Sequence, residues 1–369
     1  MKQIMCFSNL PWSSTPTRTQ HLVARFKEAE ILFFDPPAPR GQPVKTAPRR
    51  VRPNITVYSL PHMMSSEGKN RFLYHRNQRK LFSHIESILI RHNFREPLLW
   101  VTSPENVHLL DLLTFRGMIY DCDRYWDDLP EEWERDLTAT ADVIFAASPG
   151  LVKRLSAYNN HVTLIPNGVN YPMFRAKSLD IPSELEQIRY PLLGWVGTIH
   201  PDLDLTPVTA AAKTRTDWTF ALVGQAGENS ELAELSQLPN VKLLGPREAM
   251  SIPDYLGRFD ACLDLSRAQD EDNDVIPCRI YEYLSTGKPI VSLTRACRES
   301  GFSDVIYHAE DASQFLSACK KAISGDALWL PLRRQELGSA AAWPIRTAEM
   351  LRTIRTAGLY PQDKTATRF

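Results

Sequence analysis

One stretch late in the chain, residues 274–292, carries side chains suited to binding a nucleotide: it reads DVIPCRIYEYLSTGKPIVS. Pro277 suits the first turn of a helix, and the Gly-Lys-Pro run that follows ends this helix before an apolar, strand-like segment. Arg279 and Glu282 are three residues apart, so they share one face near the amino end of the helix, where phosphate is attracted. A carboxylate at that point can also accept both hydroxyls of a ribose. The alternative is an amphipathic helix on which Arg279 and Glu282 form a solvated ion pair.

The elements that must position this stretch form two successive series of alternating strands and helices. This pattern predicts an α/β protein with two doubly wound parallel sheets. The first series ends with a strand at 162–165, and the second begins with a strand at 192–196. Residues 174–191 have few apolar positions, and a chain of 369 residues exceeds the usual size of one domain. We therefore expect domains at 1–175 and 176–369.

Glycines follow three strands of the second series directly. They are Gly197, which precedes Thr198, then Gly224 and Gly245. In open α/β sheets, ligands bind at the carboxyl ends of the strands, so these turns are candidates for close backbone approach to a ligand. The alternative is that the glycines are needed only for tight turns.

The stretch at 274–292 resembles the donor-nucleotide signature of GT-B glycosyltransferases of the bacterial group 1 type, which are retaining and use nucleotide sugars. In retaining members a second acid stands eight residues before the glutamate, and Asp274 occupies that position. The segments IYDCDRYWDDL, ADVIFAASPGLVKRL and LIPNGVNYPMF also resemble this family, so the resemblance covers nearly the whole chain. The matching single residues are Trp12, Arg18, Gln20 and Leu22 near the start, and Pro277, Arg279, Tyr281, Glu282, Tyr283, Leu284, Gly287, Lys288 and Pro289 in the signature.

The resemblance implies the GT-B fold, with two Rossmann-like domains facing across a cleft and a last helix, about 343–356, that crosses back to the first domain. It implies transfer of a sugar from a nucleotide sugar, carrying UDP or GDP, to an acceptor hydroxyl. The acceptor would be a lipid-linked or glycan intermediate in bacterial cell-surface polysaccharide synthesis. No metal ion or other cofactor is expected, since positive charge and helix amides would stabilise the leaving diphosphate.

The resemblance also implies roles for single residues in the second domain. Glu282 would hold the ribose, Arg279 the diphosphate, and Asp274 a sugar hydroxyl as a catalytic residue. The other donor-binding residues would be Gly197, Thr198, Gly224, Gly245, Arg247 and Tyr281, with 244–247 facing the base. Many retaining members carry an Arg and a Lys after the first glycine turn, which here reads VGTIHPDLDL. His200 or Arg267 would have to substitute for them.

In the first domain, Asp121 and Asp123 are predicted to be catalytic residues that face the acceptor, and Arg18 and His21 are predicted to bind it. An alternative for Asp121-Cys122-Asp123 is the Asp-x-Asp metal site of GT-A glycosyltransferases. A nucleotide-binding epimerase lacks support, because the first turn has no Gly-x-Gly-x-x-Gly sequence. A catalytically idle nucleotide-sugar-binding protein stays open.

Charge is distributed unevenly along a chain whose net charge is zero. Residues 36–100 contain 12 Lys or Arg and 3 acidic residues, which favours an anionic membrane surface as a partner. Nothing resembles a nucleic-acid module. No apolar run reaches the roughly 18 residues needed to span a bilayer, so we expect a cytoplasmic protein, peripheral on the inner face of the membrane. The six cysteines are irregularly spaced and predict free thiols, without zinc.

Overall fold

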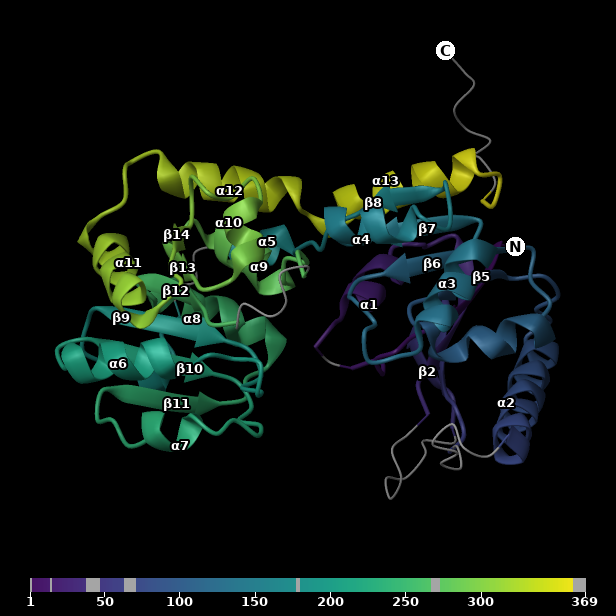
Figure 1. The fold of residues 1–369 in the computed structure, drawn as a ribbon, viewed down its shortest axis with the longest axis horizontal. Coiled ribbons are helices and arrows are strands. Elements are labelled where there is room, and N and C mark those ends of the chain that lie inside the picture. The colour runs from purple at the N-terminus through teal and green to yellow at the C-terminus, as the bar shows by residue number, and fades with distance from the viewer. Residues whose placement is uncertain are drawn as a thin grey trace, which may run out of the picture. The chain divides into compact units, whose positions relative to one another are not determined.

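The computed structural model describes residues 2–13, 15–37, 47–62, 71–176, 180–266 and 273–360. The chain forms two compact units, which we call unit 1 (Met1–Pro166 with Arg346–Phe369) and unit 2 (Asn167–Ile345). Figure 1 labels their helices and strands. Each unit is a parallel sheet covered by helices, as the alternation of strand and helix in the sequence predicts.

Within its described residues, unit 1 has an eight-stranded sheet in the order β3-β4-β2-β1-β5-β6-β7-β8. All neighbouring strands are parallel except β3 and β4, which are antiparallel at the edge. The strands are β1 (Lys2–Phe7), β2 (Ala29–Asp35), β3 (Arg49–Arg52), β4 (Ile55–Ser59), β5 (Leu98–Val101), β6 (Gly117–Cys122), β7 (Val143–Ala146) and β8 (Val162–Leu164).

The first helix of unit 1 begins with a capping box. The hydroxyl of Thr17 accepts the backbone N–H of Gln20, whose side chain accepts the N–H of Thr17 in return. The Gln20 amide also donates to the carbonyl of Ser13 at 3.0 Å, which fixes the preceding loop. The helices of unit 1 are α1 (Arg18–Val23), α2 (Arg71–Arg91), the 3₁₀ segment η1 (Pro104–Leu112), α3 (Glu131–Thr140), α4 (Pro149–Leu155) and most of α13 (Trp343–Thr356).

Unit 2 has a six-stranded parallel sheet in the order β11-β10-β9-β12-β13-β14, counted over its described residues. Its strands are β9 (Leu192–Val196), β10 (Thr219–Val223), β11 (Val241–Gly245), β12 (Ala261–Asp264), β13 (Ile290–Ser292) and β14 (Tyr307–His308). The strands follow one another outward from β9 in one direction and from β12 in the other. This is the doubly wound arrangement.

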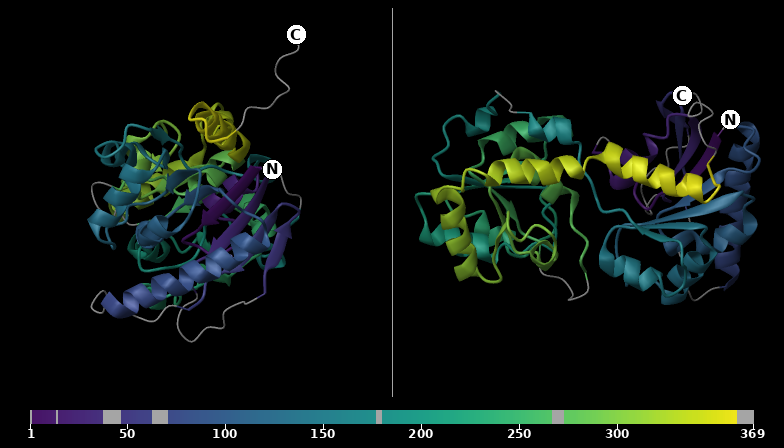
Figure 2. Two further views of the ribbon diagram at one scale, coloured as in Figure 1. Left: turned by 90° about the vertical axis from the view of Figure 1, so that its right-hand side faces the viewer. Right: turned by 90° about the horizontal axis from the view of Figure 1, so that it is seen from above.

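Helices cover both faces of the unit 2 sheet, and each face has its own apolar core (Figure 2). One core contains Leu193, Trp195 and Leu263 from the strands and side chains from α6 (Thr206–Thr214), α7 (Leu232–Leu235) and α11 (Ala312–Ser324). The other contains Leu192, Cys262 and Ile290 from the strands. It is covered by α5 (Tyr171–Arg175), α8 (Ile252–Arg258), α9 (Cys278–Thr286) and α12 (Leu330–Ala340). Further elements of unit 2 are α10 (Arg295–Glu299) and the 3₁₀ segments η2 (Ser183–Leu185) and η3 (Ala249–Ser251).

The chain divides after Pro166, whereas the sequence suggested a boundary near residue 175. Phe174 explains the difference, because its buried side chain belongs to the core of unit 2 that contains α9. A short helix with one buried aromatic residue is enough to join a segment that otherwise reads as a linker. At the other end, Arg346–Phe369 belongs to unit 1, where Tyr360 packs edge-on against Phe26 at 5.9 Å between ring centroids.

Among the described residues, no helix combines the length and apolar character that crossing a bilayer requires.

Candidate functional site

Three of the predicted ligand-binding residues of unit 2, Gly197, Arg279 and Glu282, lie at the point where the strand order reverses, between β9 and β12. Open parallel sheets bind ligands in the crevice outside the carboxyl ends of the strands at such a point. Here β9 leads into Gly197, β12 ends at Asp264, and α9 begins at Cys278. The geometry therefore brings the glycine turn and the first turn of α9 to the same edge of one sheet.

The turn after β9 runs beside the turn after β10, and both require glycine. Gly197 and Gly224 have φ of +149° and +146°, values that residues with a Cβ rarely adopt. A Cβ on residue 224 would lie 1.6 Å from the carbonyl oxygen of Gly197, so no larger residue fits. Backbone hydrogen bonds join the ends of neighbouring strands. The N–H of Gly197 donates to the carbonyl of Val223, and the N–H of Gly224 donates to the carbonyl of Gly245, each at 2.9 Å.

Asp264 is a fully buried carboxylate at the end of β12 that sequence reasoning missed. Side chains alternate along a strand, so Asp264 and Ser292 of the paired strand β13 share the face covered by α9. One carboxylate oxygen, Oδ2, accepts the hydroxyl of Ser292 at 2.8 Å and that of Thr294. The other, Oδ1, accepts the hydroxyl of Ser266 at 3.1 Å and Nε of Arg279 at 3.2 Å. Each oxygen thus has two donors, which satisfies a buried charge.

Arg279 reaches from the first turn of α9 to the glycine turn. Its Nε binds Asp264, its Nη2 donates to the Ser266 hydroxyl at 2.6 Å, and its guanidinium carbon lies 5.6 Å from the ring centroid of Trp195. Nη1 faces the turn, since a Cβ on residue 197 would lie 3.1 Å from it. Within the described residues Nη1 has no hydrogen-bond partner. These contacts fix the Arg279 guanidinium at the ends of β9 and β12 and leave its Nη1 hydrogens for a ligand.

Glu282 lies one turn further along α9 and is half-buried. Burial raises the pKa of its carboxyl to about 7, and the positive charge of Arg279 opposes that rise. A carboxyl that changes charge near neutral pH at a ligand-binding edge is typical of a functional residue. The next residue, Tyr283, is fully buried and its phenol oxygen accepts the backbone N–H of Val196 at 3.1 Å.

The structure places other predicted donor-binding residues differently. Tyr281 is buried in the core, where its ring packs edge-on against Phe302 at 5.8 Å. Arg247 donates from Nε to the phenol of Tyr255 at 2.6 Å and forms an ion pair with Glu184. Gly245, at the end of β11, has φ of +71°. Thr198 is exposed in the turn after β9.

Asp274 lies in the irregular segment that precedes α9 and is half-buried. The side-chain amide of Asn167 holds this segment by donating to the carbonyl of Ile276 at 3.0 Å. Of the two suggested basic substitutes, Arg267 lies outside the described residues. The other, His200, lies 3.2 Å from the carboxylate of Asp202 in the loop between β9 and α6.

In unit 1, Arg18 and Asp121 form a buried ion pair at the end of β6. Arg18 donates from Nη2 to Oδ1 at 2.9 Å and from Nε to both oxygens at 3.1 and 3.4 Å. Both side chains are almost wholly inaccessible, with 3% and 1% of their surface exposed. Removing either partner would leave an uncompensated charge in the protein interior, so this pair orients α1 on the sheet.

Asp123 continues on the same face as Asp121, one residue beyond the strand. Burial raises the pKa of Asp123 to about 6, an effect that Arg18 opposes and Asp121 reinforces. Burial, together with Arg25 and Arg52, lowers the pKa of His21 to about 4, so its imidazole is neutral at pH 7. Unit 1 therefore has the half-buried carboxyl of Asp123 next to Asp121, whose charge Arg18 balances, and the neutral imidazole of His21 on α1.

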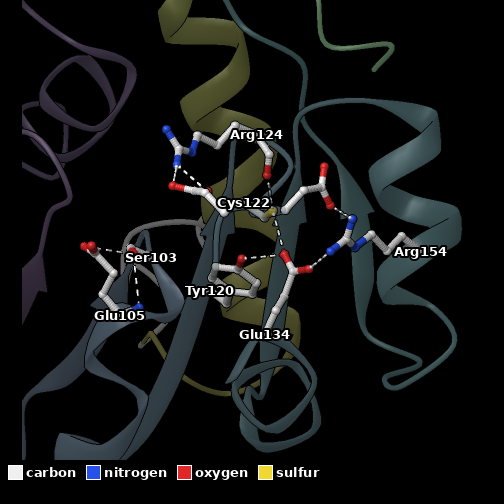
Figure 3. Close-up of polar contacts among 9 residues, drawn as sticks. Ser103, Glu105, Tyr120, Cys122, Arg124, Glu134 and Arg154 are labelled. Atoms are coloured by element: carbon white, nitrogen blue, oxygen red, sulfur yellow. Dashed lines mark hydrogen bonds and ion pairs between the residues drawn. The ribbon is translucent and has the colours of Figure 1, made fainter. Parts of the chain in front are cut away.

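The opposite face of β6 carries a separate polar network, which Figure 3 shows in close-up. The phenol of Tyr120 donates to Glu134 of α3 at 3.0 Å, and Glu134 also pairs with Arg154 of α4 at 2.9 Å. The thiol of Cys122 donates to the carbonyl of Arg124 at 3.3 Å. Because Cys122 faces these groups, the sequence Asp-Cys-Asp presents its two acids to one side and its thiol to the other. Among the described residues, no group of three or more His, Cys, Asp and Glu side chains is placed to hold a metal ion.

The doubly wound parallel sheets of the two units define the GT-B fold, and solved GT-B structures align with nearly the whole chain. Sucrose-phosphate synthase from Thermosynechococcus elongatus aligns with a TM-score of 0.74 and 14% identity, over 96% of this chain and 99% of that one. Anabaena HepE in complex with UDP aligns with a TM-score of 0.69 and 14% identity, over 96% of this chain and 100% of HepE. A trehalose-6-phosphate enzyme from E. coli bound with UDP-2-fluoro glucose aligns with a TM-score of 0.71 and 10% identity, over 98% of this chain and 100% of that one.

Sequence comparison finds similarity to one class of such enzymes. Residues 191–324 match the family model described as glycosyl transferases group 1. The putative teichuronic acid biosynthesis glycosyltransferase TuaH of Bacillus subtilis (strain 168) is 27% identical over 350 residues, which cover 86% of this chain and 87% of TuaH. These comparisons support the resemblance to group 1 glycosyltransferases, and the expected GT-B fold is confirmed.

Proposed function

We propose that this enzyme transfers a sugar from a UDP-sugar to an acceptor hydroxyl, and that unit 2 binds the donor at the strand-order reversal between β9 and β12. The observation that carries the proposal is the meeting of three features there: the Gly197 turn, the Nη1 of Arg279, which has no partner among the described residues, and the half-buried carboxyl of Glu282. The first two suit a diphosphate and the third suits a ribose. UDP is favoured over GDP because HepE and the E. coli enzyme were solved with uridine nucleotides.

Asp274 is the catalytic residue of this proposal in unit 2, where it would bind a hydroxyl of the transferred sugar. Its place eight residues before Glu282 supports a retaining reaction. In unit 1, Asp123 and His21 would bind the acceptor, and the ion pair of Arg18 with Asp121 would hold α1 for that purpose. Metal independence also belongs to the proposal, because Arg279 and backbone amides would stabilise the leaving diphosphate.

For the acceptor we propose a lipid-linked or glycan intermediate in the synthesis of a cell-surface polysaccharide. The similarity to TuaH, a putative teichuronic acid biosynthesis glycosyltransferase, supports this class of acceptor. A lipid-linked acceptor would require the enzyme to work at a membrane surface, and α2 is suited to that. Its Arg76, Arg79 and Lys80 are exposed, and Ile90 on the same helix is 73% exposed.

The structure also narrows this membrane proposal. Leu81 is fully buried and Phe82 is half-buried, so neither is available to enter a lipid interface. Nothing is described for the side chains of residues 71–75, which include the suggested Arg71, Phe72, Leu73 and Tyr74. The surface that we propose therefore consists of Arg76, Arg79, Lys80 and Ile90, with attraction of about 1 kcal/mol for each cation near an anionic leaflet.

A thermal-shift screen of nucleotide sugars, followed by a turnover assay, tests the donor assignment. A bound donor raises the melting temperature by mass action, so a hit would identify both the base and the sugar. We expect UDP-sugars to give the hits, and Glu282→Ala to remove them. Glu336→Ala is the matched control, because Glu336 is an exposed residue of α12 that pairs with Arg333. Binding without release of UDP in the presence of candidate acceptors would refute the catalytic part of the proposal.

A further inference from the structure

The buried carboxylate Asp264 has a place in the fold that its own strand does not explain. It stands where an apolar side chain would otherwise complete the buried strand ACLD, and it is fully buried beneath α9. Burying a carboxylate costs free energy unless it is paired and hydrogen-bonded. The four donors around Asp264 offset this cost. Three of these donors are hydroxyls from Ser266, Ser292 and Thr294, and the fourth is Arg279.

The hydroxyls of Ser292 and Thr294 fix the orientation of the Asp264 carboxylate independently of Arg279. Ser292 and Thr294 both donate to Oδ2, which leaves Oδ1 facing α9. The amide of Thr294 in turn donates to the Ser292 hydroxyl at 3.0 Å, which fixes that hydroxyl from the other side. The position of Oδ1 is therefore set by strands β12 and β13 and the turn that follows them.

The locked carboxylate fixes the guanidinium at two nitrogens. Nε lies 3.2 Å from Oδ1, and Nη2 lies 2.6 Å from the Ser266 hydroxyl, which itself donates to Oδ1. The centroid of the Trp195 ring lies 5.6 Å from the carbon of the same guanidinium. With Nε and Nη2 both engaged, Nη1 is the nitrogen directed at the Gly197 turn. A planar guanidinium held in this way loses little further freedom when it binds a second anion.

The glycine turn itself provides little positive charge. In the sequence of the loop from Gly197 to Leu205, His200 is the one basic residue, and Asp202 and Asp204 are acidic. The ring nitrogen Nδ1 of His200 lies 3.2 Å from the Asp202 carboxylate and accepts the backbone N–H of Asp202 at 3.3 Å. Positive charge for a diphosphate at this turn must come from elsewhere, and Arg279 reaches it from α9.

We propose that Asp264 is a positioning residue that holds Arg279 against the Gly197 turn, so that this single arginine binds the donor diphosphate in place of basic residues within the turn. The inference rests on the proposed function. Asp264 does not itself touch the nucleotide. Its negative charge orients the guanidinium and leaves Nη1 for a phosphate oxygen.

A double-mutant cycle in nucleotide affinity tests this role. UDP and GDP are titrated into the parent by calorimetry, and the tighter binder is used as the probe for Asp264→Asn, Arg279→Met and the double variant. If Asp264 acts through Arg279, Asp264→Asn weakens binding about tenfold in the parent and has no further effect in the Arg279→Met background. Loss of the orienting contact changes affinity, whereas a purely structural role would change only the melting temperature.

Two more variants keep the test decisive. Asp260→Asn is the matched control, because Asp260 lies at the opposite end of β12 and accepts the N–H of Leu192 at 2.7 Å. It is expected to lower the melting temperature and leave nucleotide affinity unchanged. If Asp264→Asn does not fold, Ser266→Ala takes its place in the cycle, since it removes the hydroxyl that links Nη2 of Arg279 to Oδ1 of Asp264 and keeps the carboxylate.

The outcomes separate this inference from the proposed function. Parent-like affinity in both Asp264→Asn and Ser266→Ala, with loss in Arg279→Met, would overturn the positioning role and leave the donor site standing. An equal loss from Asp264→Asn in both backgrounds would also overturn it, because the effect would then not pass through Arg279. A parent that binds neither nucleotide would refute the donor site and this inference with it.

Discussion

Tyr283 and Val196 are joined by a hydrogen bond in which the backbone N–H of Val196 donates to the phenol oxygen at 3.1 Å. The bond ties the middle of α9 to the last residue of β9, immediately before Gly197. Arg279 and Glu282 lie on the same short helix, so this contact fixes their height above the glycine turn. A bound nucleotide would therefore meet a turn and a helix that are already aligned.

Changing Tyr283 to Phe removes this bond while keeping the ring in the core. We expect a loss of about 1 kcal/mol in stability, the usual net value of one hydrogen bond, and weaker nucleotide binding because the turn loses its support. Calorimetry and thermal melting measure the two effects. Tyr307→Phe is the matched control, since it breaks a 2.9 Å bond to Asp326 elsewhere in unit 2. Equal nucleotide affinity in both variants and the parent would contradict the prediction.

Glu282 should make nucleotide affinity depend on pH. Only the ionised carboxylate accepts both ribose hydroxyls, and burial raises its pKa to about 7. Affinity is therefore expected to increase as pH rises through about 7, and this dependence should disappear in Glu282→Gln. Calorimetry in a pH series measures it. A parent whose affinity is flat across neutral pH would show that Glu282 does not bind the ribose as a carboxylate.

Protein stability should respond to Glu282 in the opposite direction. The folded-state pKa of about 7 lies above the ordinary value of 4.5, so the folded chain binds more protons than the unfolded chain between these values. The contribution of this residue to stability is then fully present below the ordinary value and is lost as pH rises through about 7. Denaturation at several pH values should show a steeper decline in this window for the parent than for Glu282→Gln.

Breaking the ion pair between Arg18 and Asp121 should destabilise unit 1 strongly. Arg18→Met leaves Asp121 as an unpaired charge in an almost inaccessible site, at a cost of about 3 to 5 kcal/mol. The double variant Arg18→Met/Asp121→Leu should recover most of this loss, because no charge is then buried. Chemical denaturation monitors both. A double variant no more stable than Arg18→Met would show that the pair does more than balance charge.

Activity is expected to survive chelation of divalent metal ions. The proposed stabilisation of the leaving diphosphate comes from Arg279 and backbone amides, which need no ion. The assay follows UDP release with EDTA present, and then with added manganese. Activity abolished by EDTA and restored by manganese would instead support Asp121 and Asp123 as metal ligands.

The exposed basic residues of α2 should direct the enzyme to anionic membranes. We expect co-sedimentation with vesicles that contain anionic lipid, weaker at high salt, and loss of this binding when Arg76, Arg79 and Lys80 are changed to Ser. The matched control changes Lys27, Arg135 and Lys153 to Ser, since these are exposed cations of unit 1 outside α2. Equal binding to neutral and anionic vesicles, or binding to neither, would refute the proposal.

The sequence predicted the architecture because local patterns determine it. The buried strands are short apolar runs, α9 and α11 have amphipathic patterns, and the helix of the signature ends at Gly287, whose φ of +78° suits glycine. The same periodicity placed Arg279 and Glu282 at the start of α9. Tyr281 was predicted to bind the donor from the family match alone, and the core position of its ring, which depends on Phe302 in a separate segment, could not be predicted from that match.

Contacts between distant segments could not be predicted. Asp264 meets Ser292 across 28 residues, and the meeting depends on the parallel register of β12 and β13, which no local pattern gives. The one available signal was an acid within the apolar run of β12. Arg18 likewise meets Asp121 across 103 residues, although both belong to segments that resembled the family. Spacing along the chain identified the residue types but not these partners.

The return of α13 to unit 1 has a practical consequence for dissecting the enzyme. A gene fragment ending at residue 166 would encode unit 1 without Met350 and Ile354, which are fully buried, and without the ring of Tyr360. To express that unit alone, a designed linker would have to splice residue 166 to residue 346. Unit 2 is encoded by one uninterrupted stretch from 167 to 345, so it can be cloned in a single piece as a reagent for nucleotide titration.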